Sequence, residues 1–150
     1  MSGSILHKYA DARLPRYTSY PTAPHFSDRV GFGTYGDWLS ALPANEPASL
    51  YLHVPFCRSM CWYCGCHTTI TARNQPILDY LNVLQEEIRM VAARVGKPLL
   101  VEKVHFGGGT PTIVEPADFM ALADLLRGHF DFTRTAELAI EIDPRTLTPD

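Results

Sequence analysis

The stretch "SLYLHVPFCRSMCWYCGC", residues 49–66, decides the predicted fold because it joins a strand directly to a loop rich in thiols. Residues 49–55 combine β-branched and aromatic side chains, and Pro55 ends the run, which is the pattern of a β-strand. The 4 cysteines of the chain all follow it, from Cys57 to Cys66. A chemically active site is therefore predicted at the end of a strand.

Disulfide bonding is one interpretation of these cysteines, and it depends on the compartment. Residues 1–20, "MSGSILHKYADARLPRYTSY", lack the basic and then apolar layout of a signal peptide. We therefore expect a cytoplasmic protein, in which thiols stay reduced and disulfides are rare.

Metal binding offers two further interpretations. Zinc fingers use two well-separated ligand pairs, whereas this chain has one cluster, which His53 and His67 would have to complete. Iron–sulfur clusters are held by thiolates from a tight loop, and the C-x3-C-x2-C spacing of Cys57, Cys61 and Cys64 fits such a loop. The spacing favours the iron–sulfur cluster and leaves zinc as the alternative.

Bulk composition sets wide limits. The chain has 150 residues and 46% hydrophobic residues, enough for one ordinary domain with a core. The formal net charge of −3 gives no indication of nucleic acid binding. No run of about 18 apolar residues is present, so no membrane-spanning helix is expected.

The segment before the first strand, residues 1–48, is expected to be irregular. Its stretch 13–27 contains three prolines and should run extended, because proline fixes φ and pushes the preceding residue out of the helical region. Residues 35–42 form a candidate short helix within it.

A long helix is predicted after the cysteine loop. Asn74 is placed as its cap, Pro76 in its first turn, and Gly96 as its stop. The apolar residues that keep the three-and-four spacing of one helix face are Ile77, Tyr80, Leu81, Leu84, Ile88, Val91 and Val95.

The remaining elements alternate. A strand is predicted over 99–106, a helix over 116–127 with Gly128 as its stop, and a third strand over 136–144. Strand, helix, strand, helix, strand predicts right-handed crossovers and a parallel sheet.

Parallel sheets carry their chemistry on the loops after the carboxyl ends of the strands. Three segments follow those ends here: the cysteine loop, "GGGTPT" at 107–112, and the acidic residues Glu141 and Asp143. They are expected to meet in one site.

The glycine segment has three interpretations. It is a turn that ends a strand, a phosphate loop, or a backbone that a ligand approaches closely. A phosphate loop would continue with Lys and Ser or Thr, which this segment lacks. Three consecutive glycines exceed what a turn needs, so close approach to a ligand is favoured.

Glu141 alternates out of phase with Leu138, Ile140 and Ile142, and we expect it on the opposite face of its strand. In a barrel that face is the interior, where a carboxylate needs hydrogen-bonding partners.

Five segments together carry a family resemblance: "PRYTSYPT", "LYLHVPFC", "CWYCGC", "HFGGGTPT" and "EIDPRTL". They resemble the radical S-adenosylmethionine enzymes and, more narrowly, the oxygen-independent coproporphyrinogen III oxidase family. The resemblance implies an α/β fold, with residues 49–150 as the first half, about three βα units, of a partial or full (β/α) barrel. The rest of the barrel is expected in a longer protein.

The resemblance also implies a ligand set. Cys57, Cys61 and Cys64 would bind three irons of a [4Fe–4S] cluster and leave the fourth iron to S-adenosylmethionine. The residues implied around that cofactor, present in one or two copies, are Tyr51, Tyr63, Gly108, Gly109, Thr110 and Glu141. No catalytic residue is assigned. The C-x-C spacing allows Cys66 as a fourth ligand, but the need for an open iron favours a position beside the cluster.

The implied activity is oxidative decarboxylation of two propionates of coproporphyrinogen III to vinyl groups, without oxygen, giving protoporphyrinogen IX in haem biosynthesis. A reduced flavodoxin- or ferredoxin-like electron donor and a monomeric state are expected with it. The alternatives are a related haem chaperone, another radical S-adenosylmethionine enzyme and a zinc-stabilised structural domain. Related chaperones tend to lack the fourth cysteine and the leading "PRYTSYPT" segment.

Overall fold

The computed structural model describes residues 21–62, 64, 65 and 67–146. The chain divides into two compact units, 1–34 and 35–150. The described part of the first unit contains the short helix η1 (Ala23–His25), and helix α2 (Phe32–Ser40) crosses the division. The short helix expected over 35–42 is confirmed as α2, which starts three positions earlier, whereas η1 was not predicted. The domain boundary expected after residue 48 stays a prediction.

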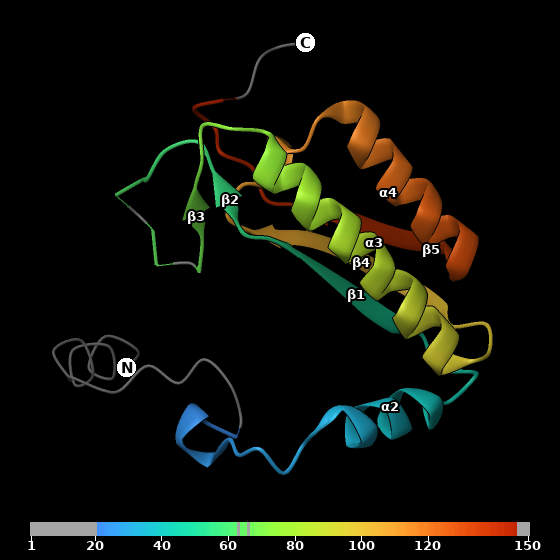
Figure 1. Cartoon of the computed structure of the whole chain (residues 1–150). Helices are drawn as coiled ribbons and strands as arrows, with labels where there is room; N and C mark the ends of the chain where they lie inside the picture. Colours follow the sequence, from blue (N-terminus) through green and yellow to red (C-terminus); the bar gives the residue numbers. More distant parts are fainter. Residues whose placement is uncertain (1–20, 63, 66, 147–150) are drawn as a thin grey trace, which may run out of the picture. The chain divides into compact units, whose positions relative to one another are not determined.

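A parallel sheet of three strands forms the centre of the second unit (Figure 1). Its strands are β1 (Ala48–Val54), β4 (Leu100–Gly108) and β5 (Asp131–Ile140), in the order β1-β4-β5. Both pairings are parallel. The parallel α/β architecture predicted from the alternating elements is therefore confirmed.

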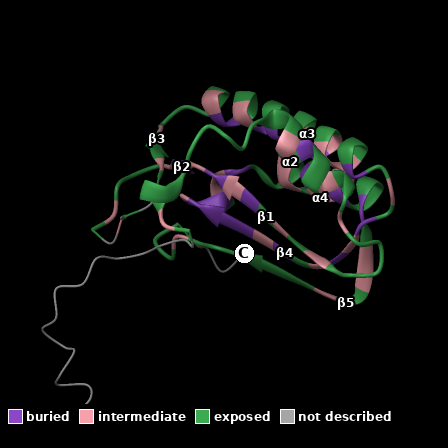
Figure 2. Cartoon of the chain, turned by 90° about the horizontal axis from the view of Figure 1, so that it is seen from below, coloured by how far each residue is buried: buried purple, intermediate pink, exposed green. Residues whose placement is uncertain are grey.

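Two helices, α3 (Gln75–Val95) and α4 (Pro116–His129), lie over one face of this sheet (Figures 1 and 2). The core between the layers consists of apolar side chains from both, including Leu52, Val54, Val104 and Phe106 from the sheet and Ile77, Leu81, Leu84, Ile88, Leu122 and Leu126 from the helices. The apolar face predicted for the long helix is the face that packs on the sheet. Of the helices described, none is long and apolar enough to cross a membrane.

Both ends of α3 lie where the sequence predicts, with Asn74 at the N-cap position, Pro76 in the first turn and Gly96 after the last residue. Gly96 ends the helix with a left-handed φ of 68°, and its N–H donates to the carbonyl of Ala92. Asn74 precedes the helix, but its side chain makes no capping hydrogen bond. The side-chain part of the expected cap is wrong, because the Asn74 side-chain oxygen accepts a hydrogen bond from the guanidinium of Arg58 instead.

The boundaries of the last two elements differ from prediction. Helix α4 runs through Gly128 to His129, and the chain then enters the sheet at once, because the N–H of Asp131 donates to the carbonyl of Leu99 at 3.0 Å. Strand β5 begins five positions earlier than the predicted start at 136 and ends at Ile140. Its pairing with β4 stops at Ile140, so residues 141–144 are not part of the strand.

The cysteine loop contains a second, small sheet that the sequence did not predict. Strands β2 (Phe56–Cys57) and β3 (Thr69–Ile70) pair in parallel and close the base of the loop. A short helix, η2 (Pro111–Ile113), follows the glycines of β4.

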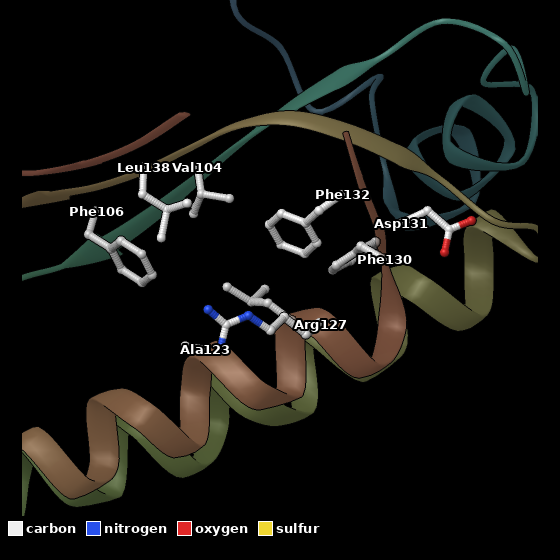
Figure 3. Close-up of a pocket in the computed structure, with 9 residues that line it drawn as sticks. Val104, Phe106, Ala123, Arg127, Phe130, Asp131, Phe132 and Leu138 are labelled. Atoms are coloured by element: carbon white, nitrogen blue, oxygen red, sulfur yellow. The ribbon is translucent and has the colours of Figure 1, made fainter. Parts of the chain in front are cut away.

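An apolar cavity of about 580 Å³ lies between α4 and strands β4 and β5 (Figure 3). We call it the β5-edge cavity. Its lining residues are Val104, Phe106, Ala123, Leu126, Arg127, Phe130, Asp131, Phe132 and Leu138. Leu138 is 61% exposed to solvent, whereas Phe106 is only 2% exposed. The cavity is thus a part of the hydrophobic layer that the described residues do not cover.

Candidate functional site

A second cavity, of about 790 Å³, lies at the carboxyl ends of the strands. We call it the cysteine cavity. Its lining includes Cys57, Cys61, Cys64, Gly108, Gly109, Thr110 and Glu141, together with Ser59, Met60, Trp62, Thr68, Ile70, Ile140, Ile142, Asp143, Pro144 and Arg145. The cysteine loop, the end of β4 and the segment after β5 therefore meet, as the parallel topology predicts. Tyr63 and Cys66 lie outside the described residues.

Three thiols of this cavity are unpaired and partly accessible: those of Cys57, Cys61 and Cys64. Cys57 lies in β2, and the N–H of Cys64 donates to the carbonyl of Cys61 at 3.2 Å in a turn. Among the described residues, no three side chains of His, Cys, Asp or Glu converge as ligands of one metal ion. Thiols spread over the wall of one cavity suit a cluster in which each iron takes a different thiolate.

Arg58 ties the cysteine loop to the start of α3. Its guanidinium donates to the carbonyls of Thr71 at 3.3 Å and Arg73 at 3.4 Å, and to the Asn74 side chain. One cation at the start of the loop thus satisfies three acceptors on the segment that follows the loop, and it ties the two ends of the segment that carries the thiols together.

The Cys57 sulfur lies beside two hydroxyl groups. It is 3.2 Å from Oγ1 of Thr110 and 3.5 Å from Oγ1 of Thr68. Thr110 is buried at 8% exposure, so its hydroxyl has little access to water.

The packing of the protein itself requires glycine at each of the three glycine positions of "GGGTPT". A Cβ atom at Gly107 would lie 2.8 Å from the Tyr51 hydroxyl, and one at Gly109 would lie 2.6 Å from the carbonyl oxygen of Phe56. Gly108 has a φ of 114°, which strains any other residue. The segment therefore lets β4 approach β1 and the cysteine loop, and it presents bare backbone to the cavity.

Glu141 follows β5 directly, and its N–H donates to the carbonyl of Phe106, in β4, at 2.9 Å. The Oε2 atom accepts a hydrogen bond from the N–H of Gly108 at 3.1 Å, and Oε1 lies 3.3 Å from Nε2 of His105. The carboxylate is about half exposed rather than buried, with 49% of the side chain accessible. Two protein groups hold it at the cavity wall and leave access to a ligand.

Tyr51 and His53 lie on β1 next to this carboxylate. Tyr51 pairs across the sheet with His105, and their rings are 5.6 Å apart. The Tyr51 hydroxyl lies 3.2 Å from Nδ1 of His53, whose Nε2 lies 3.3 Å from the carbonyl of His67. Both ring nitrogens of His53 are thus engaged within the protein, which suits a structural histidine better than a metal ligand.

An ion pair closes the cavity after β5. Arg145 bonds Asp143 at 2.6 Å, and this guanidinium holds the pKa of the Asp143 carboxyl below its usual range. The hydrogen bond to Asp143 also raises the pKa of Arg145, and the nearby Cys61 and Cys57 add to that shift. A permanent positive charge therefore lies close to the thiols.

Sequence reasoning did not find three of these groups: Thr68, His105 and Arg145. Arg145 was visible in "EIDPRTL", but no pattern gave it a partner. His105 lies opposite Tyr51 only through the register of β1 and β4. Thr68 reaches Cys57 only because the loop folds back through β2 and β3.

Comparison with known proteins decides the family. A family model described as the Radical SAM superfamily matches residues 51–150. The chain belongs to the Radical SAM superfamily. Membership implies a [4Fe–4S] cluster and S-adenosylmethionine, and the three free thiols of this Radical SAM chain fit such a cluster.

Curated relatives carry a narrower name. The chain is 56% identical over 150 residues to the oxygen-independent coproporphyrinogen III oxidase of Bradyrhizobium diazoefficiens, covering 100% of this chain and 33% of that protein. It is 44% identical over 138 residues to the enzyme of the same name from Paracoccus denitrificans, covering 91% and 30%. This Radical SAM chain thus spans about a third of the length of the curated relatives it matches.

A solved structure shows the same fold. The coproporphyrinogen III oxidase HemN of Escherichia coli, described as a Radical SAM enzyme, matches with a TM-score of 0.81 at 38% identity, over 97% of this chain and 31% of that one. The arrangement of β1, β4 and β5 with their helices is therefore that of a Radical SAM fold.

Proposed function

We propose that the protein carrying this chain is an oxygen-independent coproporphyrinogen III oxidase, and that this chain supplies its cluster and cofactor site. The observation that carries the proposal is the cysteine cavity, where the C-x3-C-x2-C thiols, the glycine segment and Glu141 meet. The names of relatives that align over 100% and 91% of the chain support the substrate, coproporphyrinogen III.

The proposed ligand set is Cys57, Cys61 and Cys64. Three thiolates leave one iron of a [4Fe–4S] cluster open for the amino and carboxylate groups of S-adenosylmethionine. When bound, the cluster and this cofactor supply the radical chemistry that removes a hydrogen atom from a substrate propionate. Cys66 is proposed to lie beside the cluster, because a fourth thiolate would occupy the open position.

The proposed cofactor contacts follow the walls of the cavity. The backbone at Gly108, Gly109 and Thr110 would meet the methionine amino group, and Glu141 would accept hydrogen bonds from the ribose hydroxyls. Glu141 is suited to this because Gly108 and His105 fix its carboxylate while half of it stays accessible. Tyr51 and Tyr63 would lie beside the same cofactor, Tyr63 through its backbone.

The wider setting is also part of the proposal. A cytoplasmic monomer would receive single electrons from a reduced flavodoxin- or ferredoxin-like protein. Two propionates must react in each substrate, so either a second S-adenosylmethionine binds with the first or successive molecules bind at one site.

Anaerobic reconstitution tests the function. The complete natural protein that carries this sequence is loaded with iron and sulfide, reduced, and given S-adenosylmethionine and coproporphyrinogen III. We expect a brown protein with broad absorption, which zinc does not give, and vinyl products. Cofactor cleavage without vinyl product would indicate another radical S-adenosylmethionine enzyme, and haem binding without product would indicate a chaperone.

A further inference from the structure

The three thiols of the cysteine cavity differ in their surroundings. The Cys57 sulfur has two hydroxyl neighbours, Thr110 at 3.2 Å and Thr68 at 3.5 Å. Among the described residues, the sulfurs of Cys61 and Cys64 have no hydrogen-bonding side chain. One ligand position is therefore electrostatically distinct from the other two.

Backbone hydrogen bonds fix both hydroxyls relative to Cys57. The N–H of Thr110 donates to the carbonyl of Phe56 at 2.8 Å, directly before Cys57. On the other side, the N–H of Thr69 donates to the carbonyl of Pro55 at 2.7 Å, which holds Thr68 at the loop base.

Gly109 completes this arrangement. A Cβ atom there would lie 2.6 Å from Oγ1 of Thr68, so only glycine leaves room for this hydroxyl next to β4. The neighbours of Cys57 are thus built into the fold and do not depend on a flexible side chain.

The direction of these hydrogen bonds follows from the chemistry of the sulfur. A thiolate bound to iron carries no proton, so it can only accept, and each threonine hydroxyl must donate. Hydrogen bonds to cluster sulfurs stabilise negative charge, and the reduced cluster carries one more negative charge than the oxidised one. Donors at the sulfur therefore raise the reduction potential.

We propose that the hydroxyls of Thr68 and Thr110 donate hydrogen bonds to the Cys57 thiolate when the cluster is bound, and that they raise its reduction potential. This inference rests on the proposed function, because it requires Cys57 to be a cluster ligand. The electron concerned comes from an external one-electron donor of the flavodoxin or ferredoxin class. The two hydroxyls thus set how readily that donor reduces the cluster.

Thr68→Val is the decisive variant, because valine keeps the β-branched shape and removes the hydroxyl. The complete natural protein is reconstituted anaerobically, its iron is counted, and its midpoint potential is measured by a redox titration followed by electron paramagnetic resonance without S-adenosylmethionine. We expect full iron and a potential shifted to more negative values. Thr68→Ser should return the potential to the wild-type value.

Thr69→Val is the matched control. Thr69 is the exposed neighbour in β3, and its hydroxyl makes no hydrogen bond among the described residues. The midpoint potential of the cluster in the Thr69→Val variant should equal that of the wild type. Thr110→Val should shift the potential in the same direction as Thr68→Val and by more, because its hydroxyl is closer to the sulfur and buried.

The outcomes separate this inference from the proposed function. A wild-type protein that binds no cluster contradicts both. A wild-type cluster with normal iron, together with unchanged potentials in Thr68→Val and Thr110→Val, overturns the hydrogen bonds alone. If Thr68→Val loses iron, Thr110→Val and Thr68→Ala replace it, and a negative shift in either supports the proposal while unchanged potentials in both overturn it.

Discussion

Two cavities of similar size border the same sheet, and they differ in what lines them. The cysteine cavity, of about 790 Å³, gathers thiols, bare backbone, a carboxylate and an ion pair at the carboxyl ends of the strands. The β5-edge cavity, of about 580 Å³, is lined mostly by apolar side chains in the helix-facing layer.

This difference shows that the functional site is identified by its position at the carboxyl ends of the strands and not by the presence of a cavity alone. Side chains of the β5-edge cavity such as Val104, Phe106 and Leu138 follow the strand alternation that builds a core. Residues of the cysteine cavity lie at or just after the carboxyl ends of the strands, where the loops of a parallel sheet carry side chains that are not part of its packed layer. The β5-edge cavity is therefore part of a packing surface, whereas the cysteine cavity is the place where chemistry can occur.

The largest expected effect is loss of the cluster from the cysteine cavity. In the complete natural protein, Cys57→Ser, Cys61→Ser and Cys64→Ser should each abolish cluster binding, because each removes one of three thiolates. Iron per chain after anaerobic reconstitution is the measurement. Near-full iron in any one of the three variants would remove that residue from the ligand set.

Cys66→Ser sharpens the same assignment. We expect it to keep full iron and near-normal absorption but to lose vinyl product, because Cys66 is proposed to lie next to the cofactor rather than on an iron. The measurements are iron content, S-adenosylmethionine cleavage and product, all on one sample. Lost iron would make Cys66 a ligand, and full product would leave it a packing residue.

Core packing should distinguish two residues of the β5-edge cavity. Phe106→Ala should lower the free energy of unfolding by about 3–5 kcal/mol, since Phe106 is 2% exposed. Leu138→Ala should cost less than about 1 kcal/mol, since Leu138 is 61% exposed in this chain. Urea unfolding of residues 1–150, followed by circular dichroism, measures both, and equal costs would mean that the cavity is closed in solution.

The smallest effect concerns the support of Glu141. His105→Ala should weaken S-adenosylmethionine binding about five-fold, which corresponds to about 1 kcal/mol for one lost hydrogen bond. Equilibrium binding to the cluster-loaded protein measures it. His105→Gln keeps a donor and should recover most of the affinity, while the exposed His129→Ala on α4 serves as the control. Equal affinity in His105→Ala and the wild type would show that Gly108 alone holds the carboxylate.

Much of the fold was predictable from local pattern. The apolar spacing from Ile77 to Val95 and the alternation of strands and helices follow from burying one face of each element. The crossover rule then makes the sheet parallel. Boundaries were less predictable: Gly128 stays inside α4, because the helix ends where Asp131 begins to pair with Leu99 and not where glycine lowers helix propensity.

The sequence by itself determined that the cysteine loop, the glycine segment and Glu141 meet, because parallel strands bring their carboxyl ends to one edge. Only the tertiary structure decided which side chains touch there. Tyr51 opposite His105 depends on the register of β1 and β4, and Thr68 beside Cys57 depends on the return of the loop through β2 and β3. Register and loop closure arise from packing between segments far apart in the chain, which no local pattern records.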